Sequence, residues 1–232
     1  MNVIITGATK GLGLAMAHQF AAAGYRILVC ARSETNLYEM VQTFQNTYSN
    51  IDIKAMPVDM SLQEEVVDFA NWCLSFGTPD IVINNAGSFL PGSIHNEAEG
   101  VLEKMMATNL YSAYHFTRAV LPSMIEKKAG HIFNICSIAS LQAYANGGSY
   151  SISKFALLGF SKNLREELKP HSIKVTAVLP GAAFTDSWVD SGVDKNRIME
   201  ADDIAKMVFA CSQLSAQAVV EEIVLRPILG DL

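Results

Sequence analysis

Three polar residues in the middle of the chain have the types and spacing of an acid/base apparatus. Tyr150 and Lys154 are four residues apart, and Ser137 lies thirteen residues before Tyr150 at the end of an apolar run. Residues at positions i and i+4 share one face of a helix, so the lysine ammonium is expected close to the phenol. A nearby cation favours phenolate and lowers the phenol pKa from about 10. A tyrosine tuned in this way can exchange a proton with an alcohol or a carbonyl near neutral pH.

Taken alone, the trio has simpler explanations. A buried tyrosine is more often a core residue with a satisfied hydroxyl, and serine, tyrosine and lysine combine by chance in long sequences. The catalytic interpretation therefore depends on the elements that position these residues and on the other motifs of the chain.

Short runs rich in valine and isoleucine alternate with longer segments of helical apolar spacing. The predicted strands are residues 2–6, 26–30, 51–57, 80–84, 130–136, 172–179 and 221–225. The predicted helices are residues 12–23, 34–47, 62–76, 101–127, 150–169 and 201–214. This order predicts an α/β fold of the Rossmann type, a doubly wound, seven-stranded, mostly parallel sheet with helices on both faces. No internal repeat or linker divides the sequence, so residues 1–232 are expected to form one dinucleotide-binding and catalytic domain.

Residues 182–199 follow a predicted strand and show no clear periodicity. We expect this segment to be a mobile substrate loop. Asn146-Gly147-Gly148 is most simply a turn that sets the entry of the helix carrying Tyr150. Five apolar or aromatic residues are candidates either for a substrate pocket or for the core: Phe89, Leu141, Tyr144, Phe184 and Trp188.

A glycine-rich turn joins the first predicted strand to the first predicted helix. It reads Thr6-Gly7-Ala8-Thr9-Lys10-Gly11-Leu12-Gly13. Glycines at such a turn let the backbone approach a pyrophosphate, which the positive N-terminus of a helix attracts. Glycines also serve ordinary tight turns, but the strand–turn–helix context favours dinucleotide binding.

The end of the second predicted strand bears on which dinucleotide binds. A ribose with a free 2′-hydroxyl favours an acidic residue there, whereas a 2′-phosphate favours arginine. Ala31 stands where the acid is expected, Arg32 follows it, and Lys10 adds a second cation. Because guanidinium pairs well with phosphate, these residues favour NADP(H) over NAD(H). The alternative is that Arg32 and Lys10 are solvated surface charges.

The composition excludes several classes of function. Apolar residues make up 50% of the chain and charged residues 17%, which suits a sizeable core. The formal net charge of −6 and the lack of a lysine or arginine block argue against nucleic acid as a partner. No apolar run reaches the ~18 residues of a membrane span, and we expect no cleavable signal. The four cysteines and five histidines lack metal-ligand spacing, so we expect reduced thiols, no metal site and a cytoplasmic protein.

The glycine turn and the Ser137/Tyr150/Lys154 trio together resemble the compact, single-domain short-chain dehydrogenases/reductases. The likeness runs from Asn2 to about Leu225. Asn84-Asn85-Ala86-Gly87 resembles the family motif that steadies the sheet and contacts the adenosine half of the cofactor. Asp59 resembles the family's adenine-binding acid, and Asn109 its catalytic asparagine. Pro180-Gly181 with Thr185 resembles its loop on the nicotinamide side.

The resemblance implies two sets of site residues. The implied catalytic residues are Asn109, Ser137, Tyr150 and Lys154. The implied cofactor-binding residues are Gly7, Thr9, Lys10, Gly11, Leu12, Gly13, Arg32, Asp59, Met60, Asn85, Ala86, Gly87, Tyr150, Lys154, Pro180, Gly181 and Thr185.

The resemblance also implies a reaction, the interconversion of a small-molecule carbonyl and an alcohol by hydride transfer with NADP(H). Tyr150 would exchange the proton, and Lys154 would lower the pKa of Tyr150 and hold the nicotinamide ribose. Ser137 would hydrogen-bond the substrate oxygen. Asn109 would anchor a water that joins Lys154 to solvent.

Two features depart from the family pattern. Cys136 stands before Ser137 where many members have a second serine, and the C-terminal residues 226–232 lack the frequent Gly-Gly ending. The resemblance further implies a homodimer or homotetramer formed through residues 101–127 and 150–169. Two other classes of function stay open: a catalytically idle dinucleotide-binding redox sensor, and a scaffold that binds no nucleotide. The segment 182–199 is too generic to identify the substrate.

Overall fold

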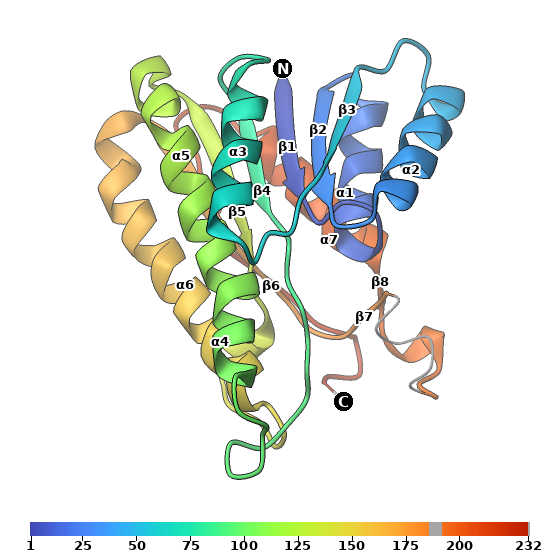
Figure 1. The fold of residues 1–232 in the computed structure, drawn as a ribbon, viewed down its shortest axis with the longest axis vertical. Coiled ribbons are helices and arrows are strands. Elements are labelled where there is room, and N and C mark those ends of the chain that lie inside the picture. Colours follow the sequence, from blue (N-terminus) through green and yellow to red (C-terminus); the bar gives the residue numbers. More distant parts are fainter. Residues whose placement is uncertain (186–191, 232) are drawn as a thin grey trace.

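The computed structural model of the chain describes residues 1–185 and 192–231. Its main feature is a seven-stranded sheet in the order β3-β2-β1-β4-β5-β6-β9 (Figure 1). The strands are β1 Asn2–Thr6, β2 Arg26–Ala31, β3 Ile53–Pro57, β4 Ile81–Asn84, β5 Gly130–Ile135, β6 Ile173–Pro180 and β9 Glu222–Leu225. Each strand runs parallel to its neighbours, so the predicted doubly wound sheet is confirmed.

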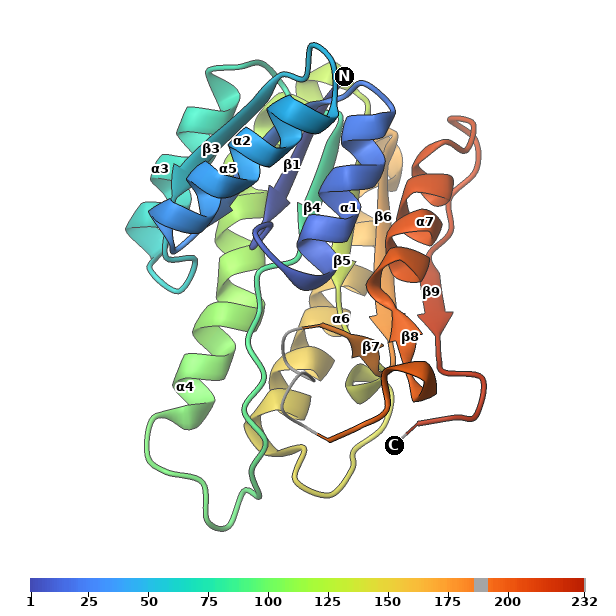
Figure 2. The ribbon, with the colours of Figure 1, turned by 90° about the vertical axis from the view of Figure 1, so that its right-hand side faces the viewer.

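Helices cover both faces of the sheet. They are α1 Gly11–Ala22, α2 Glu34–Thr47, α3 Gln63–Leu74, α4 Val101–Met106, α5 Ser112–Lys127, α6 Gly148–Leu168 and α7 Ala201–Ser212. Helices α1, α2 and α7 lie on one face, and α3, α5 and α6 lie on the other (Figures 1 and 2). The helix boundaries follow local chemistry; for example, α2 begins after Ser33, whose hydroxyl accepts a hydrogen bond from the Asn36 amide at 3.2 Å.

Strand residues alternate between the two hydrophobic cores. Val3 and Ile5 pack toward α1 and α7, whereas Ile4 packs toward α3 and α5. All three side chains are 0% exposed. This burial on both faces explains why the strands read as nearly continuous apolar runs.

The prediction of one continuous helix over residues 101–127 was wrong. The chain forms α4, then a π-helical turn η1 at Ala107–Tyr111, and then α5. A π turn adds one residue to a helical turn and interrupts the regular hydrogen-bond ladder, and such turns are frequent at functional sites. Nothing in the residue types of this segment indicates the interruption, because they are compatible with an ordinary helix.

The predicted loop 182–199 contains regular structure at both ends. The two-residue strands β7 Ala183–Phe184 and β8 Met199–Glu200 pair in parallel, and the 3₁₀ turn η5 spans Lys195–Arg197. Two further short turns in the described part of the chain are η2 Ile138–Ser140 and η3 Lys169–His171. Within residues 1–185 and 192–231, no helix combines the length and apolar character needed to cross a membrane.

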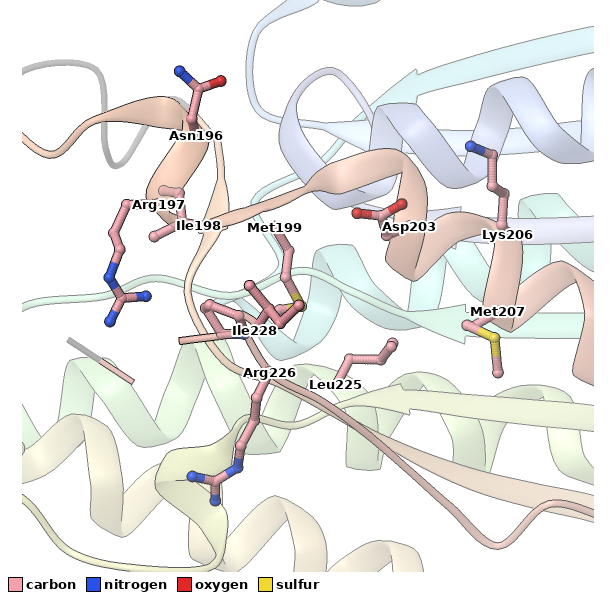
Figure 3. A pocket seen from close by; sticks show the side chains of 11 residues that line it. Asn196, Arg197, Ile198, Met199, Asp203, Lys206, Met207, Leu225, Arg226 and Ile228 are labelled. Carbon is pink, nitrogen blue, oxygen red and sulfur yellow. The ribbon is translucent and has the colours of Figure 1, made fainter. Parts of the chain in front are cut away.

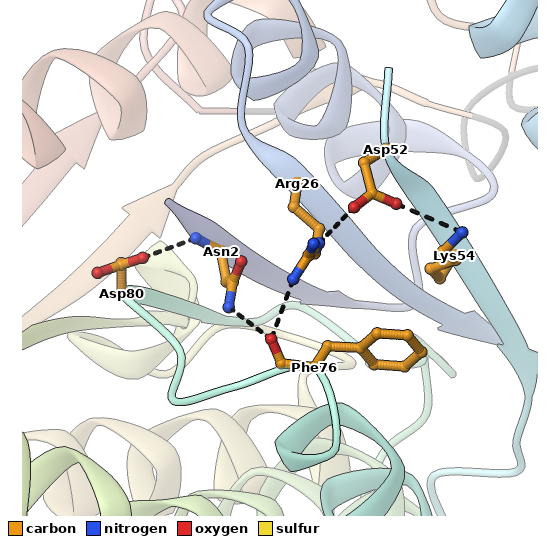
Figure 4. Close-up of polar contacts among 6 residues, drawn as sticks. All are labelled: Asn2, Arg26, Asp52, Lys54, Phe76 and Asp80. Carbon is orange, nitrogen blue, oxygen red and sulfur yellow. Dashed lines mark hydrogen bonds and ion pairs between the residues drawn. The ribbon is translucent and has the colours of Figure 1, made fainter. Parts of the chain in front are cut away.

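A polar network joins the amino ends of four strands (Figure 4). The Phe76 carbonyl oxygen accepts hydrogen bonds from Arg26 Nη1 at 3.0 Å and from Asn2 Nδ2 at 3.3 Å. The Arg26 side chain also pairs with Asp52, and the Asn2 amide donates to Asp80 at 2.7 Å. This network anchors the edge of the sheet opposite to the predicted site residues.

Candidate active site

The predicted site residues gather at the carboxyl edge of the sheet, which is the lower end in Figure 1. Because the strands are parallel, the segments that follow them meet at the same edge. The glycine turn follows β1, Asn85 follows β4 and Ser137 follows β5. Arg32 follows β2 and Asp59 follows β3 in the same way.

Glycine is required in the turn after β1 for two different reasons. Gly7 has φ of 65° and Gly11 has φ of 55°, the left-handed conformation that glycine adopts without strain. Gly13 is needed for space, because a Cβ there would lie 2.4 Å from the Gly7 carbonyl oxygen and 2.5 Å from Asn85 Nδ2. The start of α1 therefore packs directly against the turn and the Asn85 side chain.

Asn85 holds this turn from the neighbouring strand. Its Nδ2 donates to the carbonyl oxygens of Thr6 and Gly7, both at 2.9 Å. In return, Thr6 Oγ1 accepts from the Asn85 amide at 3.0 Å and from the Ala86 amide at 2.9 Å. The Asn85 side chain thus positions the glycine turn, and the contact predicted between Asn85 and the cofactor stays a prediction.

Arg32, Lys10 and Asp59 are the charged residues predicted to contact the adenosine half of the cofactor. The Arg32 and Lys10 side chains are exposed. Burial acts to raise the pKa of Asp59, but hydrogen bonds from Ser61 and the charge of Arg32 hold that pKa below its usual value. The Met60 side chain is buried in the core, so a contact from Met60 to a cofactor would use its backbone.

The loop after β6 lies against the glycine turn. A Cβ at Gly11 would lie 3.2 Å from Thr185 Cγ2, so these two residues are in contact. Pro180 ends β6, and the Gly181 amide donates to the Leu225 carbonyl oxygen at 2.8 Å. Leu12 packs against the core below the turn.

The structure brings Ser137, Tyr150 and Lys154 together. Tyr150 is the third residue of α6, and the Ser137 side chain lies close enough to its hydroxyl to act on its pKa. Lys154, one turn later, has its Nζ 5.8 Å from the centre of the Tyr150 ring. This Nζ donates to the carbonyl oxygen of Ile135, at the end of β5, at 2.8 Å. The predicted i,i+4 geometry on one helix face is therefore present.

The predicted direction of the Tyr150 pKa was wrong for this structure. Burial raises the pKa of Tyr150, and the hydrogen bond from Ser137 offsets only part of this effect. Burial also lowers the pKa of Lys154 to about 8. Desolvation is the largest cause of both shifts, and the Lys154 ammonium donates its hydrogen bond to the Ile135 carbonyl oxygen. Tyr150 is therefore a neutral phenol at neutral pH.

Asn109 lies in the π turn and is 1% exposed. Its Oδ1 accepts from the Ser88 amide at 2.7 Å, and its Nδ2 donates to the Ser88 carbonyl oxygen at 3.0 Å and to Ser153 Oγ at 2.9 Å. A Cβ at Gly87 would lie 3.2 Å from Asn109 Oδ1 and 3.7 Å from Lys154 Nζ. Asn109 and Lys154 thus flank the same position, and glycine at residue 87 leaves the space between them open.

Cys136 is a buried neighbour of the trio. Burial raises the pKa of its thiol to about 11, although the charge of Lys154 acts in the opposite direction. The thiol is therefore neutral and adds no charge beside Tyr150. All four cysteines are buried and free. Among the residues that the structure describes, no group of three or more His, Cys, Asp and Glu side chains could hold a metal ion.

The predicted pocket residues within the described ranges are exposed rather than core. Phe89, Leu141, Tyr144 and Phe184 are 37–46% exposed. The Phe89 ring packs edge-on against the Tyr150 ring, with centroids 4.8 Å apart. Trp188 lies outside the described residues, as do five of its neighbours in the predicted loop.

One hollow in the structure is lined by none of these four residues. It has a volume of about 550 Å³ and is bounded by η5, β8, α7 and the segment after β9 (Figure 3). Its charged side chains already have partners, since Arg226 pairs with Asp231, Lys206 pairs with Asp202, and Arg197 donates to the carbonyl oxygens of residues 229–231. None of its lining residues within the described ranges is a predicted catalytic or cofactor-binding residue, but residues 196–199 belong to the predicted substrate loop.

Comparisons with known proteins agree with this geometry. The sequence pattern of the family described as short chain dehydrogenase matches residues 1–196. An uncharacterized oxidoreductase of Staphylococcus saprophyticus is 29% identical over 97% of this chain and 96% of its own length. Serine dehydrogenase, solved in its closed form with NADP+, superposes with a TM-score of 0.89 at 28% identity and covers 100% of this chain and 97% of its own. L-Sorbose reductase from Gluconobacter frateurii, solved with NADPH and L-sorbose, has a TM-score of 0.89 at 26% identity, with 97% and 94% covered.

A parallel sheet with a glycine turn after β1 and a Ser/Tyr/Lys group at its carboxyl edge defines a dinucleotide-dependent oxidoreductase fold. The match over residues 1–196 makes the assignment specific: the chain belongs to the short chain dehydrogenase family.

Proposed function

We propose that the protein is an NADP(H)-dependent oxidoreductase that interconverts a small-molecule carbonyl and an alcohol, with Tyr150 as the acid/base. The observation that carries this proposal is the placement of Ser137 beside the Tyr150 hydroxyl, with Lys154 one helical turn away. The pair lies at the same edge of the sheet as the glycine turn. A proton relay beside a dinucleotide site has the parts that hydride transfer needs.

The residues after β1, β2 and β3 fit NADP(H). The close approach at Gly13 and the left-handed Gly7 and Gly11 leave the turn open to a pyrophosphate. Arg32 is exposed directly after β2 and could pair with a 2′-phosphate, and Ala31 supplies no carboxylate to repel that phosphate. NADP+ and NADPH are bound in the serine dehydrogenase and L-sorbose reductase structures. We therefore propose NADP(H) rather than NAD(H) for this chain.

Each catalytic side chain has a defined task. NADP(H) supplies or accepts the hydride when it is bound. Tyr150, neutral because of its burial, donates its hydroxyl proton to the substrate oxygen in the direction of reduction. Ser137 hydrogen-bonds the same oxygen, and the Lys154 cation stabilises the phenolate that Tyr150 becomes. Asn109 holds Ser88 and Ser153 in place and borders the space at Gly87 through which Lys154 can be linked to solvent.

The test is turnover by the wild-type protein and two tyrosine variants. NADPH consumption is followed with carbonyl compounds that include L-sorbose, and NADP+ reduction with alcohols that include L-serine. Tyr150→Phe keeps the ring but removes the proton, so kcat should fall by roughly 10²–10⁴-fold. NADPH affinity, measured by titration against NADH, should stay within a few-fold of wild type. The matched control is Tyr38→Phe, which changes an exposed tyrosine on α2 and should keep wild-type kcat.

Three results would contradict the proposed mechanism or favour another class of function. Wild-type turnover by Tyr150→Phe would remove Tyr150 from the mechanism. Tight NADPH binding with no turnover on any compound would favour a dinucleotide-binding redox sensor. A protein that binds neither dinucleotide would be a scaffold.

A further inference from the structure

Helix α6 begins without a capping side chain of its own. Its N-cap residue is Gly147, and Gly148 is the first helical residue. The first amides of a helix have no partner within the helix and need an acceptor from elsewhere. Tyr150 lies in this first turn, so whatever holds the turn also sets the position of the Tyr150 hydroxyl.

The missing cap comes from Glu97, a residue 52 positions before Ser149. Glu97 Oε1 accepts a hydrogen bond from the Ser149 amide at 3.0 Å, and Oε2 accepts one from the Ser149 hydroxyl. A carboxylate at a helix N-terminus is favoured by the free amides and by the helix dipole. We refer to these two hydrogen bonds as the Glu97 cap.

The backbone around α6 is shaped to admit this carboxylate. Gly148 has φ of 36°, and a Cβ there would lie 2.1 Å from Glu97 Oε1 and 2.4 Å from the Gly92 carbonyl oxygen. Any other residue at position 148 would therefore displace the Glu97 cap. The glycine that the sequence suggested as a simple turn residue also makes room for an acceptor from another loop.

Two more hydrogen bonds join the same two loops. The Gly92 amide donates to the Asn146 carbonyl oxygen at 3.0 Å, and Ser93 Oγ donates to Asn146 Oδ1 at 2.8 Å. Asn146 is left-handed with φ of 60°, a conformation that asparagine tolerates better than most residues. Figures 1 and 2 both show the loop after β4 beside the loop before α6 at the lower end of the molecule.

The loop that carries Glu97 also touches Tyr150 directly. Phe89, at the start of that loop, packs its ring edge-on against Tyr150. The loop thus contacts the tyrosine at its ring and, through Ser149, at its helix terminus. Neither contact involves the groups that hold the glycine turn, which are Thr6, Gly7 and Asn85.

We propose that Glu97 is a positioning residue: it caps α6 from the loop after β4 and so holds the Tyr150 hydroxyl in hydrogen-bond reach of Ser137. This inference rests on the proposed role of Tyr150 as the acid/base. It assigns to the loop after β4 a task in catalysis that is separate from cofactor binding.

The experiment compares Glu97→Ala, Glu97→Gln and Glu99→Ala. Glu97→Ala leaves the Ser149 amide without an acceptor, so kcat should fall about tenfold while the Kd for NADPH stays within twofold. Glu97→Gln retains an oxygen that can accept from the Ser149 amide and should recover most of the lost kcat. Glu99→Ala changes an exposed carboxylate two residues away and should match wild type. Turnover is measured with NADPH and the panel compound that the wild-type protein reduces fastest.

A second readout does not depend on turnover. Amide hydrogen exchange of residues 148–151 should become at least about tenfold faster in Glu97→Ala, with exchange in the sheet unchanged. The NMR signal of Tyr150 labelled at Cζ, assigned by its loss in Tyr150→Phe, should shift in Glu97→Ala and return toward wild type in Glu97→Gln.

The outcomes separate the two proposals. Unchanged exchange and an unchanged Tyr150 signal in Glu97→Ala would overturn the Glu97 cap, whatever the activity. A kcat within twofold of wild type, or equal losses of kcat and NADPH affinity, would overturn its positioning role. If Glu97→Ala shows faster exchange and a shifted Tyr150 signal, but the wild-type protein reduces no compound, the Glu97 cap is supported and the proposed oxidoreductase function is refuted.

Discussion

At the scale of single residues, burial decides the charge states in the candidate active site. Lys154 is 6% exposed, and burial lowers its pKa to about 8. Tyr150 is held neutral by the same effect. A spacing of four residues on a helix predicts that a lysine and a tyrosine are neighbours, but the cost of desolvation depends on the atoms that enclose them.

The buried charge of Lys154 should make the protein less stable than it would be without it. Its pKa in the folded state, about 8, lies below its unfolded value of 10.5, so the unfolded chain binds more protons between these values and stability rises with pH across that window. Lys154→Met should therefore abolish turnover yet raise the free energy of unfolding at pH 7 by roughly 2 kcal/mol, after allowing for the lost hydrogen bond to Ile135. Denaturant unfolding measures this gain.

The pH dependence of the difference in stability between Lys154→Met and wild type provides a check on this prediction. The advantage of Lys154→Met should shrink between pH 7 and pH 10, as Lys154 in the wild-type protein loses its proton. Lys104→Met makes the same change at an exposed position on α4 and should alter stability by no more than about 0.5 kcal/mol. A Lys154→Met protein less stable than wild type at pH 7 would contradict this account of the buried cation.

At the scale of elements, the β1–turn–α1 unit depends on close backbone packing. Gly13 lies against the Gly7 carbonyl and the Asn85 side chain, and Asn85 in turn ties the turn to the end of β4. A side chain at position 13 would push apart two groups that hold the turn in place. Packing, rather than flexibility, is the reason for glycine at this position.

The matched pair Gly13→Ala and Gly159→Ala tests this reasoning. Gly13→Ala should lower the free energy of unfolding by roughly 2–3 kcal/mol and weaken NADPH binding, because the new methyl overlaps the Gly7 carbonyl. Gly159 lies within α6 with nothing within 4 Å of a Cβ, so Gly159→Ala should stabilise the protein by about 0.5–1 kcal/mol through its higher helix propensity. Thermal unfolding and NADPH titration measure both effects. Equal effects of the two substitutions would show that the contacts at Gly13 do not matter.

At the scale of the whole molecule, exposed apolar side chains gather on the helices that the sequence predicted to form an interface. They are Leu102, Tyr111, Tyr114, Ile152 and Phe155, which are 36–48% exposed. They come from α4, η1, α5 and α6. Apolar groups grouped in this way are typical of surfaces that another protein covers, and a second copy of the chain is the partner that family resemblance implies.

We propose a homodimer or homotetramer formed through these helices. Light scattering should give a mass of about 50 or 100 kDa, twofold or fourfold the 25.2 kDa of one chain. Phe155→Glu should reduce the assembly, because it places a charge in the apolar surface. Tyr38→Glu, a similar change at an exposed tyrosine on α2, should leave the mass unchanged. A wild-type mass near 25 kDa would refute the prediction.

Patterns in the amino-acid sequence predicted the architecture and the candidate site residues. Apolar strands alternating with helical segments are local patterns, and they sufficed to predict seven strands and a parallel sheet. The glycine turn, Ser137, Tyr150 and Lys154 could be chosen from spacing and residue type, because parallel strands bring the segments that follow them to one edge.

The hydrogen bonds that hold these residues, and the charges that they carry, depend on contacts that the sequence pattern does not show. The π turn that contains Asn109, the Asn85 hydrogen bonds to the glycine turn and the Glu97 cap all join segments that are far apart in sequence or share no local pattern. The raised pKa of Tyr150 and the lowered pKa of Lys154 likewise follow from burial by distant elements. Residue spacing describes neighbours along the chain, whereas desolvation and hydrogen bonding depend on neighbours in space.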